Sequence, residues 1–300
     1  MHTHGEHCDH GGGERTTRAL TAALAVTLVI LVAELIGGWL SNSLALLADA
    51  GHVLTDAGAL GLSLFVAWFA RQPVTARKTF GYLRWEILAA LINGATLLLL
   101  SAWVVIEALS RFRQPEPVVG SLMLVVAIGG LAGNGIAAWL LHPLHGSSLN
   151  VRGAYLHIIG DLLASVGTIV AAIVIQVSGW LYADPIASLL TTALIVRGAW
   201  ALVKESVDVL LESTPAHISL GDVRQVLQGI PGVESVHDLH VWTVTSGVVA
   251  LSAHAIVREP ERQQQVLERA YELMRPMGIQ HVTVQIEQRE IRDCEQHLHP

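Results

Sequence analysis

Two short sequence patterns carry the residues that could do chemistry. Residues 52–56 (HVLTD) and 157–161 (HIIGD) both read His-x-x-x-Asp, and each pattern lies in a strongly apolar run. Residues i and i+4 of a helix share one face, so each pattern offers an imidazole nitrogen and a carboxylate oxygen in one direction. Two such faces together supply two nitrogen and two oxygen ligands, a set that suits tetrahedral Zn²⁺. Ionisable groups at membrane depth are costly, which marks them as candidates for a functional site.

Each of His52, Asp56, His157 and Asp161 has an alternative interpretation as a buried polar residue that hydrogen-bonds to a neighbouring helix. Two identical pairs in different apolar segments favour the metal site. Imidazole must be neutral to bind a metal, so protons and metal compete for the same nitrogens. Four protein ligands leave no open position for a reaction, so the set suits reversible carriage of an ion. Asp49 is an acceptor that orients His52, a carboxylate at the entrance of the site, or a helix cap or solvent contact.

The composition indicates a membrane-embedded body with a soluble tail. The 300 residues are 52% hydrophobic and 14% charged, whereas soluble domains carry about 25% charged residues. Residues 212–300 hold 12 of the 25 acidic residues, which predicts an acidic soluble domain there. The net charge of −7 argues against a nucleic-acid partner. The two cysteines, Cys8 and Cys294, define no disulfide framework. The first 15 residues are polar, so we expect no cleavable signal peptide.

Six apolar segments are long enough to span a membrane, for which about 20 helical residues are needed. They cover residues 19–40, 44–69, 87–109, 118–141, 149–177 and 185–202. Lys and Arg residues near the segment ends concentrate on one side, which predicts that this side and both chain termini are cytoplasmic. Both His-x-x-x-Asp patterns then fall near the middle of the bilayer, the depth expected for a site used in alternating access.

Further polar groups lie outside the two patterns. Residues 1–15 are expected to form a disordered, His-rich cytoplasmic tail that attracts metal ions, and this tail includes His7 and Cys8. Polar residues within the spans are interpreted mainly as interhelical hydrogen-bonding groups, and Glu34 is the most notable because it is charged.

Residues 212–300 predict a small two-layer α+β domain. Helices are expected at 220–228 and 261–274, and strands at 236–245, 248–257 and 281–287, in the order αββαβ. A domain of this size is near the lower limit for independent folding, so dimerisation would stabilise it. Four histidines and a glutamate on or beside these strands (His237, His240, His254, His281 and Glu287) favour a regulatory metal site over ordinary surface histidines. Strand alternation places His237 and His240 on opposite faces.

Five stretches of this sequence resemble the cation diffusion facilitator family of zinc transporters. They are residues 43–56, 79–86, 157–161, 237–242 and 281–287, so the resemblance covers nearly the whole chain. It implies a homodimeric Zn²⁺/H⁺ antiporter with a transport domain of six transmembrane helices at residues 16–211. The resemblance also implies a ferredoxin-like cytoplasmic domain for metal sensing and dimerisation at residues 212–300. The two His-x-x-x-Asp pairs would be the transport site, and their histidines imply a preference for zinc over cadmium.

The resemblance also implies ligands outside the membrane. His237, His254 and Glu287 would hold a regulatory zinc ion, and His7 and Cys8 resemble an element that completes such sites from the partner's tail in animal members. Leu83 stands where some members carry a histidine, so no metal site is expected in that loop.

The sequence therefore predicts a multi-pass protein of the cell inner membrane that exports Zn²⁺ in exchange for H⁺, with Cd²⁺ and Co²⁺ as further candidate substrates. The protein is not expected to be an enzyme. One rival hypothesis is an intramembrane metalloenzyme, which needs an open metal position and a general base, for which Asp49 is the only obvious candidate. The other is a non-transporting membrane metal sensor, in which substitution of Asp56 or Asp161 leaves the output intact.

Overall fold

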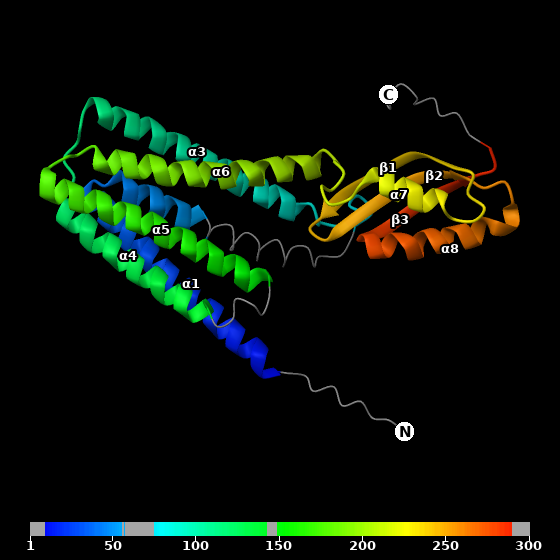
Figure 1. Ribbon diagram of the computed structural model, residues 1–300, viewed down its shortest axis with the longest axis horizontal. Helices are drawn as coiled ribbons and strands as arrows, with labels where there is room; N and C mark the ends of the chain where they lie inside the picture. Colours follow the sequence, from blue (N-terminus) through cyan, green and yellow to red (C-terminus); the bar gives the residue numbers. More distant parts are fainter. Residues whose placement is uncertain (1–9, 56, 58–74, 143–148, 290–300) are drawn as a thin grey trace. The chain divides into compact units, whose positions relative to one another are not determined.

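The computed structural model describes residues 10–55, 57, 75–142 and 149–289, which belong to two compact units. The first unit draws on residues 1–61 and 93–201, and the second on residues 62–92 and 202–300. Within the described residues, five helices are long and apolar enough to cross a membrane (Figure 1). They are α1 (His10–Ser41), α3 (Trp85–Arg113), α4 (Gly120–Leu141), α5 (Leu149–Ser178) and α6 (Ala183–Leu210). A sixth apolar helix is described over Leu44–Thr55. The prediction of an α-helical membrane body is confirmed.

The start of the first membrane helix differs from the expected boundary, and the expected end of the second span lies outside the described residues. Helix α1 begins at His10, so the last residues of the tail expected to be disordered (1–15) are helical. A helix extends cheaply once it is nucleated, which allows the apolar α1 to continue back into polar sequence. The second span was expected to reach residue 69, and most of its second half lies outside the described residues.

Small residues let the membrane helices approach each other closely. Helix α4 packs against both α1 and α5, the neighbours beside it in Figure 1. Gly37 of α1 faces Val126 of α4 so closely that a Cβ at Gly37 would lie 2.4 Å from Val126 Cγ2. Alanines of α4, α5 and α6 form a buried cluster with Ala45 and Leu46 of the helix Leu44–Thr55. Association of helices in lipid depends on such close packing because burial of apolar surface gives little driving force there.

A buried polar network fixes the start of the helix that carries His52. Asp184, at the first turn of α6, accepts hydrogen bonds from Ser43 Oγ (2.7 Å), Leu44 N (2.8 Å) and Ala45 N (3.2 Å). These two backbone groups belong to the first turn of a helix and have no partner within it. Arg111 of α3 donates to the carbonyl of Asn42 (2.7 Å) and lies 3.5 Å from Asp184 Oδ2. The network therefore ties the turn before the helix Leu44–Thr55 to α3 and α6.

The C-terminal domain has the predicted element order. It contains α7 (Leu220–Gln228), β1 (Ser235–Thr245), β2 (Val248–Ile256), η2 (Pro260–Arg262), α8 (Gln263–Met274), η3 (Arg275–Met277) and β3 (Ile279–Glu287). The sheet order is β1-β2-β3, in which β1 and β2 pair antiparallel and β2 and β3 pair parallel. Val223 and Leu227 of α7 and Val266 and Met274 of α8 are buried in one core with the strands. The face of the sheet opposite this core carries more polar side chains, which include His237 and His254.

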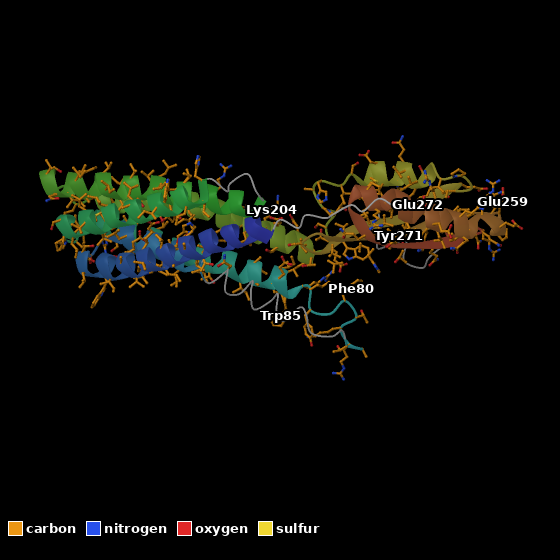
Figure 2. All side chains as sticks on the ribbon, turned by 90° about the horizontal axis from the view of Figure 1, so that it is seen from below. Phe80, Trp85, Lys204, Glu259, Tyr271 and Glu272 are labelled. Atoms are coloured by element: carbon orange, nitrogen blue, oxygen red, sulfur yellow. The ribbon has the colours of Figure 1, made fainter. Side chains whose placement is uncertain are left out.

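Exposed side chains mark the ends of the apolar segments and the outside of the tail domain. Trp85 lies at the start of α3 and Lys204 lies in the last part of α6, and both side chains are exposed (Figure 2). On α8, Tyr271 is exposed beside Glu272, on the surface away from the core. The apolar face of α8 thus covers the sheet, while its polar face meets solvent.

Candidate metal sites

The structure brings together one residue from each His-x-x-x-Asp pattern. His52 lies on the helix Leu44–Thr55, and Asp161 lies on α5. Their Nε2 and Oδ1 atoms are 4.0 Å apart, and the two side chains are 20% and 9% exposed. Two ligands of one tetrahedral zinc ion are about 3.3 Å apart, from bond lengths near 2.0–2.1 Å. A movement of under ~1 Å would therefore let both atoms bind one ion.

Of the other two predicted ligands, Asp56 and His157, the structure describes only the backbone of His157. Asp56 lies outside the described residues. His157 belongs to the backbone of α5, one turn before Asp161, and its side chain lies outside the description. The one-turn spacing places residues 157 and 161 on the same face of α5. The complete four-ligand set remains a prediction.

Two further carboxyl groups lie beside this pair. Glu34 of α1 and Asp49 are 2% and 3% exposed. The carboxyl groups of Asp49 and Asp161 both interact electrostatically with that of Glu34. Gly130 of α4 provides the space, because a Cβ there would lie 2.8 Å from Glu34 Oε1. Sequence reasoning interpreted Glu34 mainly as a helix-contact residue, although a charge within an apolar span was the signal that could have placed it here.

The second candidate site lies on the sheet of the tail domain. His237, His254 and Glu287 each offer a ligand atom within 4.8 Å of the other two. His254 Nδ1 is 3.1 Å from Glu287 Oε1, and His237 Nε2 is 3.6 Å from Glu287 Oε2. Two imidazoles and a carboxylate form a common zinc ligand set that leaves a fourth position open.

Strand pairing explains why these three residues meet. His237 of β1 lies directly opposite His254 of β2, and their rings are 5.2 Å apart. Glu287 ends β3, two residues beyond the partner of His254, so its side chain points to the same face. Its side chain is 1% exposed and accepts a hydrogen bond of 2.9 Å from Gln285 Nε2. This contact orients the carboxylate towards the histidines.

The remaining candidates of the tail are not members of this three-residue group. The register of β1 and β2 shifts between His237 and His240, and Asp238 adopts a left-handed φ of 47° there. Because His240 pairs with Ser252, two residues from His254, this irregularity puts His240 on the same face as His237, and the prediction of opposite faces is wrong. His240 Nε2 lies 2.9 Å from Asp238 Oδ1, and Asp238 Oδ2 lies 3.6 Å from His254 Nε2. His281 is not part of the three-residue group among the described residues. His7 and Cys8 lie outside the described residues.

Comparison with known proteins identifies both parts of the chain. Residues 20–211 match the cation efflux transmembrane domain, and residues 215–289 match the cation efflux protein cytoplasmic domain. The chain is 47% identical to the zinc transporter ZitB of Pectobacterium atrosepticum, over 95% of this chain and 88% of that protein. It is 42% identical to ZitB of Escherichia coli, over 99% of this chain and 96% of that protein.

Another relative, whose name states a broader range of substrates, has a sequence identity to this chain close to that of the ZitB proteins. The cadmium, cobalt and zinc/H(+)-K(+) antiporter of Bacillus subtilis is 41% identical, over 93% of this chain and 91% of that protein. The match of both domain models, together with relatives that align over nearly the full length, shows that the chain belongs to the cation diffusion facilitator (cation efflux) family.

Proposed function

We propose that this protein is an antiporter that exports Zn²⁺ across the inner membrane in exchange for protons. The observation that carries the proposal is the approach of His52 Nε2 and Asp161 Oδ1 from two different membrane helices. The relatives named as zinc transporters and as a cadmium, cobalt and zinc/H(+)-K(+) antiporter support zinc as the principal substrate and protons as the exchanged ion. Cd²⁺ and Co²⁺ are candidate secondary substrates.

The ligand chemistry couples the two ions. Zinc requires the deprotonated forms of His52, Asp56, His157 and Asp161, so binding of the ion releases protons from these groups. When the site faces the proton-rich side, protons compete for the same atoms and displace the metal. Two carboxylates neutralise the ion in the low-dielectric membrane, and two imidazoles complete its shell. Exchange then needs no group beyond the ligands themselves.

The direction of transport in this proposal follows from the expected orientation of the chain. Lys and Arg residues near the span ends favour a cytoplasmic position for both termini. Zinc then enters the site from the cytoplasm and leaves on the opposite side, against inward proton movement.

We further propose that the tail domain senses cytoplasmic zinc in a homodimer. His237, His254 and Glu287 would hold the ion, and their open fourth position needs another ligand. His7 and Cys8 of a partner's tail remain candidates for that ligand. The buried Glu287 carboxylate between two imidazoles is the arrangement that supports this site.

Replacement of Asp161 by alanine tests the transport proposal. The variant should lose zinc-driven proton movement in liposomes, because the ion loses a charged ligand in a low-dielectric site. Size-exclusion chromatography should still show the wild-type dimer. Glu205→Ala, which removes an exposed carboxylate near the end of α6, serves as the control and should retain flux. Wild-type flux in Asp161→Ala would refute the proposal.

The same assay separates the two rival functions. A membrane metal sensor that transports nothing would show no zinc-dependent proton movement in the wild type. A metalloenzyme would need a substrate position on the ion, which two histidines and two aspartates would fill. The relatives are named as transporters, which does not favour either rival.

A further inference from the structure

The ring of His52 has a second nitrogen that the transport site does not use. Nε2 faces Asp161, so Nδ1 lies on the other edge of the ring, where it is buried. A histidine that binds metal through one nitrogen usually donates the N–H of the other to a fixed acceptor. That hydrogen bond sets the tautomer and keeps the ligating nitrogen directed at the metal.

A small cavity adjoins His52 between the helix Leu44–Thr55, α3 and α6. Its volume is about 10 Å³, room for about one water molecule. Its polar lining groups besides His52 are Ser101 of α3 and Thr192 of α6. The full lining is Ala48, His52, Leu97, Leu100, Ser101, Val104, Thr192 and Ile195. Most of the lining is apolar, so the few polar groups in the cavity have few alternative hydrogen-bond partners.

Thr192 offers a hydroxyl group that its own helix does not use. The side chain is 2% exposed, and Oγ1 is buried without a hydrogen-bond partner among the described residues. Ser165 Oγ of α5 is also without a partner among the described residues, whereas two other buried hydroxyls of the spans bond within their own helix. Thr168 Oγ1 donates to Ala164 O (3.2 Å), and Ser188 Oγ donates to Pro185 O (2.9 Å). A buried hydroxyl without a partner destabilises the fold, so a hydrogen-bond partner within the cavity would remove that penalty.

We propose that Thr192 is a positioning residue of the transport site, which holds one water molecule in this cavity that accepts the Nδ1–H of His52 and donates to Thr192 Oγ1. Ser101 lines the same cavity and can hold that water from α3. The contact keeps the proton on Nδ1 and leaves the lone pair of Nε2 for the metal. The inference rests on the proposed function, because it takes His52 as a zinc ligand.

Loss of the hydroxyl should weaken zinc binding more than it slows transport. Without the acceptor, His52 can place its proton on Nε2, and that tautomer cannot bind the ion. Loss of such outer contacts typically weakens metal binding about 10- to 100-fold. The four direct ligands stay in place, so the maximal rate at saturating zinc should change little.

The test compares Thr192→Val, Thr192→Ser and the control Thr168→Val in the full-length protein. Valine matches the shape of threonine without its hydroxyl, and serine keeps the hydroxyl. Proton-coupled zinc flux in liposomes, measured against zinc concentration, gives the half-saturating concentration and the maximal rate. Isothermal titration with zinc in detergent gives the affinity independently. Thr192→Ala, which also removes the hydroxyl, replaces the valine variant if that variant does not assemble.

Thr192→Val should raise the half-saturating concentration at least ~10-fold and keep the maximal rate within about twofold. Thr192→Ser should restore wild-type affinity, and Thr168→Val should behave as wild type. Unchanged affinity in Thr192→Val, or equal impairment in Thr192→Ser, overturns the inference. The outcome differs from failure of the proposed function, which wild-type flux in Asp161→Ala would reveal.

Discussion

Replacement of Asp184 by alanine should destabilise the membrane domain severely. The Asp184 side chain is fully buried and accepts hydrogen bonds from Ser43 Oγ, Leu44 N and Ala45 N. Alanine would leave the two N–H groups at the start of the helix without their acceptor. It would also take away the carboxylate that lies 3.5 Å from the Arg111 guanidinium, whose side chain is 7% exposed.

The size of the effect follows from these contacts. A lost helix cap costs about 1 kcal/mol, and removal of one partner of a buried ion pair costs about 3–5 kcal/mol. Arg111 keeps the Asn42 carbonyl and Glu107 as partners, so we expect a total near the lower end, about 3–4 kcal/mol. Asp184→Asn keeps one acceptor oxygen and should cost roughly half as much.

Glu116→Ala provides a matched control on the same arginine. Glu116 Oε2 lies 3.5 Å from Arg111, but its side chain is 52% exposed. An exposed ion pair contributes about 0–1 kcal/mol, so this variant should stay near wild type. Unfolding in mixed detergent–SDS micelles, followed by tryptophan fluorescence, gives the free-energy differences. If Asp184→Ala and Glu116→Ala differ by less than ~1 kcal/mol, the buried network does not stabilise the fold as described.

Three further predictions concern packing, selectivity and sensing. Gly37→Ala should cost about 1–3 kcal/mol in the same unfolding assay, because its Cβ would lie 2.4 Å from Val126, whereas Gly129→Ala meets nothing within 4 Å and should be neutral. His52→Asp removes a nitrogen ligand and should increase Cd²⁺ flux relative to Zn²⁺ flux in liposomes; an unchanged ratio would place selectivity elsewhere. Glu287→Gln should weaken zinc binding by the tail domain about 10-fold or more in equilibrium dialysis of the full chain, with flux at saturating zinc retained.

The class of the fold and the candidate ligands of the site could be predicted from the sequence. Membrane spans are visible because hydropathy is a local property of a stretch about 20 residues long. The order αββαβ follows from local periodicities of 3.6 and 2 residues. The two His-x-x-x-Asp patterns are also local, since one helical turn separates their members. These features indicated zinc ligands before any helix was placed beside another.

Only the tertiary structure decided which groups from different elements meet. Sequence reasoning did not foresee that Asp184 would cap the helix Leu44–Thr55, since the two segments lie about 140 residues apart in the chain. Glu34 and Thr192 reach the neighbourhood of Asp161 and His52 only because of how α1 and α6 are rotated about their axes. The sequence did not specify those rotations, because helix packing sets them through many small contacts.

In the tail domain, too, the local sequence pattern did not predict contacts that depend on strand pairing. Alternation along the strand predicted opposite faces for His237 and His240, and this prediction is wrong: they pair with His254 and Ser252, which share one face of β2. The irregular register between these two histidines was not visible in the sequence. The pairing of His237 with His254 and the approach of Glu287 depend on the register of three strands. The candidate ligands were therefore visible in the sequence, while their geometry depends on long-range strand and helix pairing.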